Sequence, residues 1–306
     1  MSRWMLLGVI AACLAPGAPA RATDSTGTAA SVPRVATLAP RVYLLGLGEA
    51  GNVLVLEGER SLLLVDTQDP ANAAAFDSAL ARLAPKPPRT IVNTHYHEDH
   101  LGGNARWRAR GATIWAHEGL PRQAAKDTII HEMGDWHRIP APPEAMPTQT
   151  FADSARFDFE GTDVQLFHLA AAHTDDDLVV WLPQVDVLHV GDIVEVGAPP
   201  FIDWWAGGTL DGMLAAVDWV LARTGEHTRI VPGHGDVVDR KWVVEYRRML
   251  AAVRSRARKA IRDGKTRQEF ADSNPCAEWA ERLGGELGAR SFAMQVHHGL
   301  GELMKR

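Results

Sequence analysis

Residues 95–100 read "HYHEDH", which places three histidines and one aspartate within six positions. The preceding stretch "TIVNT" (90–94) has the β-branched, apolar composition of a buried strand. On a tight loop after such a strand, the first two histidines can point to one side while Asp99 and His100 turn toward a second point. Imidazole and carboxylate groups are common zinc ligands. The stretch therefore predicts two adjacent metal sites, which need further ligands from elsewhere in the chain.

Three other metal-capable side chains follow predicted strands. His173 comes after "DVQLFHLAA", Asp192 after "DVLHVG" and His234 after "RIVPG". Gly191 and Gly233 precede the last two and let the backbone turn sharply there. These three residues are the candidates to complete the two sites.

The pattern around these residues predicts sheets covered by helices. Short β-branched and leucine-rich runs begin at residue 42, and helical patterns interrupt them. The helices are expected at residues 71–84, 104–110, 209–224 and 238–262. Residues 118–150 are rich in proline and are expected to form a long loop or a helix plus a loop. Strands and helices come twice in the same order, which favours a β-sandwich core in two similar halves.

Composition limits the class of partner. The chain has 306 residues, of which 46% are hydrophobic and 23% charged, as in an ordinary soluble enzyme. The formal net charge is −6 and no block of Lys and Arg stands out. We therefore do not expect nucleic acid or an anionic membrane as the main partner. The expected partner is a small-molecule substrate. The composition leaves the oligomeric state open.

The first 22 residues predict a secretory signal peptide. Arg3 precedes an apolar stretch from Met5 to Ala15, and small residues favour cleavage after Ala20 or Ala22. This stretch is shorter than the about 20 residues that a transmembrane helix needs, so no stable membrane span is expected. We therefore expect a protein exported to the periplasm or the medium.

An alternative concerns the cysteine in this region. Residues 10–13, "IAAC", resemble a bacterial lipobox, in which Cys13 would carry a lipid anchor. Cys276 is the only other cysteine, so no internal disulfide is expected after cleavage, and we expect Cys276 to be an inert surface or helix-start residue. Residues 23–40 are expected to form a flexible leader.

A set of motifs in a fixed order identifies the family. Asp66 in "LLLVDT", the 95–100 cluster, His173 in "AAHTDDD", Asp192 in "HVGD" and His234 in "VPGHG" follow one another along the chain. With these motifs the chain resembles the metallo-β-lactamase superfamily over roughly residues 41–240. The resemblance implies an α/β fold, namely an αββα four-layer sandwich with the metal site along one edge of the sheets. Residues 241–306 are then expected to form a C-terminal helical extension.

The resemblance also implies roles for the clustered residues. Two zinc ions would be held, and the same ligands also suit iron or manganese. The first zinc would take His95, His97 and His173, the second Asp99, His100 and His234, and Asp192 would bridge the two. Asp66 would not bind metal but would orient the loop. Asp99 would be catalytic, because it would orient the nucleophile and could move its proton.

Two departures from the commonest zinc β-lactamases affect the predicted activity. Those enzymes carry a cysteine at the position of Asp192, and three residues later a lysine that binds the lactam carboxylate. Here that position is Glu195, which would repel the carboxylate. We therefore predict an exported dizinc hydrolase that uses a zinc-bound hydroxide on a small ester, thioester, lactone or related bond. The alternative is a β-lactamase with at least weak activity, and a remote one is a non-catalytic metal-binding protein.

Other residues could have either a functional role or a purely structural one. Trp204 and Trp205 in "PPFIDWWAGG" either pack against a helix or line the substrate groove beside Asp192, as Glu195 and Trp136 could. Two of the remaining histidines, His168 and His189, are interpreted as core or sheet-face residues. The others are interpreted as surface residues, namely His117, His131, His137, His227, His297 and His298. The run 175–177, "DDD", is interpreted as a solvated turn.

Overall fold

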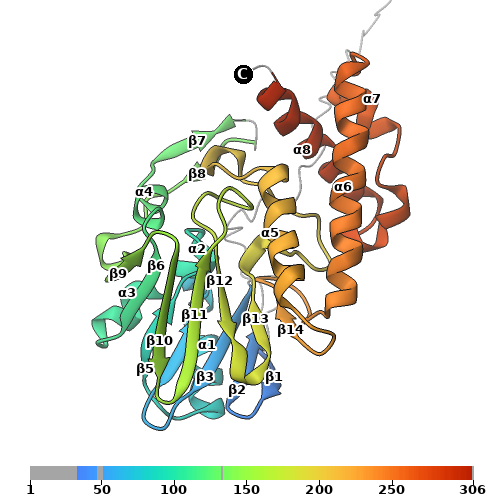
Figure 1. Ribbon diagram of the computed structural model, residues 1–306. Coiled ribbons are helices and arrows are strands. Elements are labelled where there is room, and N and C mark those ends of the chain that lie inside the picture. The colour runs from blue at the N-terminus through green and yellow to red at the C-terminus, as the bar shows by residue number, and fades with distance from the viewer. Residues whose placement is uncertain (1–32, 47–50, 132–133, 305–306) are drawn as a thin grey trace, which may run out of the picture.

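The computed structural model describes residues 33–46, 51–131 and 134–304 (Figure 1). Two sheets are stacked face to face and helices cover their outer faces, which confirms the predicted αββα sandwich. The expected signal peptide, residues 1–22, and the first part of the expected leader lie outside the described residues. Among the described residues, no helix combines the length and the apolar character needed to cross a membrane.

The first sheet contains seven strands and carries α1 (Ala73–Leu83) and α3 (Asn104–Ala109) on its outer face. In spatial order its strands are β1 (Arg34–Ala39), β2 (Val42–Gly46), β3 (Asn52–Glu57), β4 (Leu62–Val65), β5 (Pro88–Val92), β6 (Thr113–His117) and β9 (Gln149–Phe151). The predicted leader is wrong for residues 34–39, which pair with β2 as β1. Most of this edge strand is exposed, so it lacks the apolar alternation that marks a strand in sequence.

The second sheet contains five strands and is covered by the C-terminal helices. Its strands are β10 (Ser154–Phe159), β11 (Thr162–His168), β12 (Leu178–Leu182), β13 (Val187–His189) and β14 (Arg229–Val231). The helices are α5 (Leu210–Arg223), α6 (Arg240–Arg262), α7 (Arg267–Asp272) and α8 (Glu286–Met304). α5 begins at the predicted cap, because the hydroxyl of Thr209 accepts a hydrogen bond from the N–H of Gly212.

Three apolar layers hold the sandwich together, and strand alternation divides the side chains among them. In β3, Val53 and Val55 pack under α1 and α3, whereas Leu54 and Leu56 face the second sheet. Both sets are buried, which explains why β3 reads as a continuous apolar run. Each such side chain contributes about 1.5–3 kcal/mol through burial.

The predicted C-terminal extension shares a core with the second sheet. Met213 and Val217 of α5, Val243 of α6 and Phe292 of α8 belong to one buried cluster. Cys276 is fully buried in this cluster and directly precedes a short 3₁₀ helix, so of the two predicted alternatives the helix-start position is confirmed and the surface position is wrong. α6–α8 therefore form part of the sandwich's outer layer.

Residues 118–150 contain more regular structure than predicted. A short helix, α4 (Leu120–Ala124), is followed by a two-stranded hairpin of β7 (Thr128–Ile130) and β8 (Trp136–Arg138). Figure 1 shows this hairpin and the C-terminal end of α8 at the same end of the molecule. The strands are only three residues long, too short for a clear alternation in sequence.

Candidate metal centre

The candidate site lies where β4 and β5 end side by side. The two strands are parallel neighbours, so their carboxyl ends meet at one edge of the sheet. Beyond β4, Asp66 accepts hydrogen bonds from the N–H and the hydroxyl of Thr94, both at 2.8 Å. These bonds tie the segment after β5, and α2 (Glu98–Leu101) begins directly after His97.

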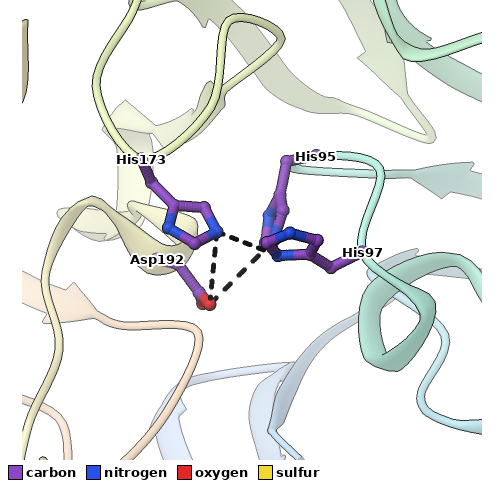
Figure 2. A group of neighbouring side chains, drawn as sticks. All are labelled: His95, His97, His173 and Asp192. Atoms are coloured by element: carbon purple, nitrogen blue, oxygen red, sulfur yellow. Dashed lines mark hydrogen bonds and ion pairs between the residues drawn. The ribbon is translucent and has the colours of Figure 1, made fainter. Parts of the chain in front are cut away.

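A first ligand group consists of His95, His97, His173 and Asp192. Figure 2 shows the three imidazole rings converging with the Asp192 carboxylate. Nδ1 of His97 lies 3.0 Å from Nε2 of His95 and 3.0 Å from Nε2 of His173. All four residues are buried, so three ring nitrogens meet in a space that little solvent reaches.

A second group consists of Asp99, His100 and His234. Nε2 of His234 lies 3.0 Å from Oδ2 of Asp99 and 3.3 Å from Nε2 of His100. The Asp99 side chain is 13% exposed, more than that of any other residue in the two groups. The second group is therefore the side of the centre that reaches toward solvent.

Asp192 lies between the two groups. Its Oδ2 is 3.9 Å from Nε2 of His95 and 3.8 Å from Nε2 of His173 in the first group. The same oxygen is 3.6 Å from Nε2 of His234 in the second, and Oδ1 is 3.5 Å from Nε2 of His100. Ligands bound 2.0–2.2 Å from one tetrahedral zinc ion lie roughly 3.3–3.6 Å apart. The measured separations are of this order, so the residues present fit two adjacent metal ions.

Acceptors outside the groups turn the ring nitrogens inward. Nδ1 of His173 donates to the carbonyl of Phe201 at 2.7 Å, and Nδ1 of His100 donates to Asp66 at 2.8 Å. Nε2 of His97 donates to Asp203 at 3.2 Å. In each ring the other nitrogen faces its group, because an N–H bonded outward leaves the lone pair on the inner nitrogen.

The protonation tendencies differ between the groups. Burial and the neighbouring histidines hold the pKa of His95 well below its usual value, and burial lowers the pKa of His173 to about 4. Burial acts to lower the pKa of His100 as well, but the carboxylates of Asp99, Asp192 and Asp66 outweigh it and raise that pKa well above the usual value. The second group thus carries an excess of negative charge that favours a cation.

The chain matches the family described as the metallo-beta-lactamase superfamily over residues 46–234. It belongs to this superfamily. The type 2 metallo-beta-lactamase of Bacillus cereus is 28% identical over 201 residues, which cover 65% of this chain and 72% of that protein. The family match includes all seven residues of the two groups, and the assembled cluster is that of a metal-dependent hydrolase.

Solved structures extend the fold comparison. A metallo-beta-lactamase from Pontibacter korlensis matches 72% of this chain with a TM-score of 0.58 and 20% identity, over 99% of its own length. A stereoselective inverting sec-alkylsulfatase from Pseudomonas sp. matches 87% of this chain with a TM-score of 0.65 and 20% identity. The chain spans only 50% of that sulfatase. The sulfatase match covers 87% of 306 residues, which is more than 234 residues. It therefore extends past residue 234, where the family match ends, into the C-terminal helices.

Asp203 and Tyr96 are residues at the centre that the sequence analysis missed. The Tyr96 hydroxyl donates to the Asp203 carboxylate, which also accepts from His97, and both side chains are buried. Burial alone would raise the pKa of Asp203, but the hydrogen bonds from His97 and Tyr96 hold it at about 2. A fully buried acid has to find donors, yet sequence does not reveal which acid is buried.

The interpretation of residues 175–177 as a solvated turn is wrong for two of the three. Asp176 and Asp177 are buried, at 1% and 3% exposure. Asp177 accepts from the N–H of His173 at 2.6 Å and from the N–H and hydroxyl of Thr174. The ligand loop needs acceptors for its backbone N–H groups, and Asp177 supplies them.

The surface interpretation of His117 is also wrong. Its ring stacks on that of His168 with centroids 3.6 Å apart, and the residue is 9% exposed. His117 Nδ1 accepts from the N–H of Gly119. His168 Nδ1 donates to the carbonyl of Asp177, so the stacked pair supports the ligand loop from outside the two groups.

The four residues expected at the substrate groove lie in different surroundings. The ring of Trp136 is 6.2 Å from that of His97. Trp204 packs against Gly299 of α8 and the second-sheet core, which favours the helix-packing alternative over the groove. Glu195 is 5% exposed and lies beside the Tyr246 hydroxyl, so it offers a substrate little surface. Trp205 is half-buried, and its role stays a prediction.

Proposed function

We propose that the protein is an exported dizinc hydrolase acting on a small ester, thioester, lactone or related bond. The observation that carries the proposal is the position of Asp192, within 4 Å of ring nitrogens in both ligand groups. A carboxylate placed this way can hold two metal ions next to each other. The proposed ligand roles are those given by the resemblance, with Asp192 as the bridge.

The chain's own residues would divide the work of the reaction. The two groups would hold metal ions whose chemistry is to activate a water molecule and to polarise the bond under attack. Asp99 is a ligand of the second group and also the most exposed of the seven side chains. It would orient that water and accept or pass on its proton. His97, His173 and His100 are held by acceptors on their outer nitrogens, which limits reorganisation during the reaction.

The β-lactamase alternative has support and opposition. The B. cereus relative supports it, because its printed name is a type 2 metallo-beta-lactamase. Asp192 at the cysteine position and Glu195 at the lysine position oppose it, since an acid there repels the lactam carboxylate. Burial of Glu195 weakens that repulsion only in part, because a nearby charge still acts over several ångströms. We therefore expect lactam turnover to be weak.

A substrate panel on zinc-loaded protein tests the proposal. It contains an aryl ester, an alkyl thioester, a lactone, a chromogenic cephalosporin and a sec-alkyl sulfate, each with and without chelator. We expect chelator-sensitive turnover of at least one of the first three, with kcat/KM above that of the cephalosporin by orders of magnitude. A chelator-sensitive cephalosporin value of about 10⁵ M⁻¹s⁻¹ or more would establish the lactamase alternative instead. If none of the five substrates is turned over, the result would support the alternative of a non-catalytic metal-binding protein.

Export is proposed on the composition of residues 1–22. Expression of the full chain in a Gram-negative host, followed by fractionation and mass measurement, tests it. We expect a periplasmic product cleaved after Ala20 or Ala22. A membrane-bound product that begins at a modified Cys13 would support the lipoprotein alternative, and an uncleaved cytoplasmic product would contradict export.

A further inference from the structure

Two aromatic rings lie beside the first ligand group without belonging to a core. The ring of Phe201 is 6.0 Å from that of His97 and 5.6 Å from that of His173. The ring of Trp136 is 6.2 Å from that of His97 and 6.5 Å from that of Phe201. Both residues are half-buried, and neither packs with the four apolar clusters of the described residues. Large apolar rings left partly exposed beside a polar centre are typical of binding sites.

Trp136 is held in place by its own strand. Residues 136 and 138 of β8 lie on the same face, because strand side chains alternate. The guanidinium of Arg138 lies 4.5 Å from the centroid of the Tyr96 ring and donates to the carbonyl of Gln123. Arg138 is 5% exposed, so this anchor is buried. The hairpin thus rests on the residue between His95 and His97, which fixes Trp136 next to His97.

Phe201 is held from the other side. Its carbonyl accepts from Nδ1 of His173, and the next residue, Ile202, donates its N–H to the side chain of Gln295 in α8. Ile202 itself is fully buried in the second-sheet core. A metal-ligand contact, a helix and a core residue therefore all position the backbone beside Phe201.

The two rings meet as a corner rather than as parallel plates. Their planes are inclined by 73°, in an edge arrangement. An apolar group placed in the corner contacts the face of one ring and the edge of the other, both of which attract aromatic partners. His97 and His173 form the base of the corner, so a group bound there is directly attached to, or close to, the bond held at the centre.

We propose that Trp136 and Phe201 form a subsite for an apolar group of the substrate, preferably an aromatic ring, on the side of the first ligand group. The inference rests on the proposed function and narrows its substrate class to esters and thioesters with a bulky apolar substituent next to the scissile bond. The β7–β8 hairpin and α8 are then the elements that set specificity.

Four thioesters test the subsite, and released thiol is the readout. They combine an acetyl or a phenylacetyl group with an ethyl or a benzyl thiol, so an aromatic ring is offered on either side of the bond. The wild-type protein should prefer one aromatic member by at least about tenfold in kcat/KM, since a well-fitted apolar group contributes 10–200-fold. Trp136→Ala and Phe201→Ala should each lower that preference several-fold, whereas Trp136→Phe should retain most of it.

Trp219→Ala is the matched control, because this half-buried tryptophan of α5 packs on Phe167 and lies in no ligand group. It should leave the preference unchanged. Zinc content equal to wild type identifies variants that keep the centre, and Phe201→Leu replaces Phe201→Ala if the latter loses zinc. An unchanged preference in zinc-containing variants of both rings would overturn the subsite.

A binding measurement separates this inference from the proposed function. Calorimetric titration of the zinc-loaded protein with phenylacetate and with acetate needs no turnover. Tighter binding of phenylacetate, lost in Trp136→Ala but kept in Trp219→Ala, supports the subsite even if no thioester is hydrolysed. Thioester hydrolysis without any aromatic preference, together with equal binding of the two acids, supports the hydrolase and overturns the subsite.

Discussion

The two ligand groups share Asp192 but depend on different parts of the chain. The first is fully buried and is oriented by Asp203 and by the Phe201 carbonyl, which belong to the segment packed on α8. The second reaches solvent through Asp99 and is oriented by Asp66 at the end of β4. The residues that orient the first group thus belong to the segment packed on α8, and the residue that orients the second lies at the end of a first-sheet strand, whereas each group has members that follow strands of both sheets. The centre assembles only when both halves of the sandwich are in place.

Loss of the shared residue Asp192 should weaken zinc binding at both groups. Asp192→Ala deletes a carboxylate that lies within 4 Å of ring nitrogens in both groups, so we expect both zinc ions to bind weakly. Turnover should fall at least about 10³-fold, in line with the loss of other essential catalytic groups. Zinc analysis after dialysis and kcat/KM measure this, with the exposed Asp153→Ala as control. Full zinc content in Asp192→Ala would contradict the bridging position.

Asp99→Ala should separate the groups. It removes one ligand of the second group and leaves the first intact, so the variant should keep one tightly bound zinc. Turnover should fall about 10²–10⁴-fold, the usual contribution of a general acid or base. Because the side chain is partly exposed, the thermal midpoint should hardly change. Unchanged activity would show that Asp99 has no part in the reaction.

The orienting acids provide a paired test. Asp203→Asn should weaken zinc at the first group and Asp66→Asn at the second, each about 10–100-fold, as for other residues that position metal ligands. Competition with a chromophoric chelator measures affinity, and cobalt spectra report which group has changed. If both variants weaken the same ion, the division between the halves is wrong.

A helix contact should reach the first group with a smaller effect. Gln295→Ala removes the acceptor for the Ile202 N–H, next to Phe201. We expect about 0.5–1.5 kcal/mol less stability, the contribution of one hydrogen bond, and a loss of zinc affinity of a few-fold at the first group only. Denaturant unfolding and chelator competition test this. Equal weakening of both ions would mean that α8 does not act through Phe201.

The stacked pair of His117 and His168 lies outside both groups, so its titration reports on folding and not on metal binding. Burial and the adjacent His168 hold the pKa of His117 at about 4, below its usual 6.5. Between these pH values the unfolded chain binds a proton that the folded chain does not, so stability is full above about pH 6.5 and falls toward pH 4. The difference in bound protons between the unfolded and the folded chain should be smaller by up to about one proton in His117→Asn. The pH dependence of the free energy of unfolding, from unfolding at several pH values, measures this difference. Identical pH slopes would place His117 in solvent.

The clustering of the seven metal-capable residues could be predicted from the sequence because their positions obey local rules. His95 to His100 follow one strand, and His173, Asp192 and His234 each follow another, so their shared edge follows from the α/β architecture. The sandwich itself follows from strands such as β3, which are apolar on both faces. Within the described residues, these features need no knowledge of distant contacts.

Residues that depend on distant contacts could not be predicted in this way. Asp203 bonds to His97 across 106 positions, and no local pattern separates it from a surface acid. Trp204 lies in a three-residue 3₁₀ helix and Trp136 in a three-residue strand, both too short for a clear pattern, yet one packs on α8 and the other lies near the centre. Their environments are set by how α8 and the β7–β8 hairpin pack, which is a property of the tertiary fold.

The most direct test of the two-group centre is a stepwise zinc titration of the metal-free protein, followed by native mass spectrometry and turnover of the best substrate in parallel. We expect two zinc ions per chain, with turnover that is completed only by the second equivalent. A single bound zinc at saturation, or full turnover at one equivalent, would contradict a centre built from two groups around Asp192.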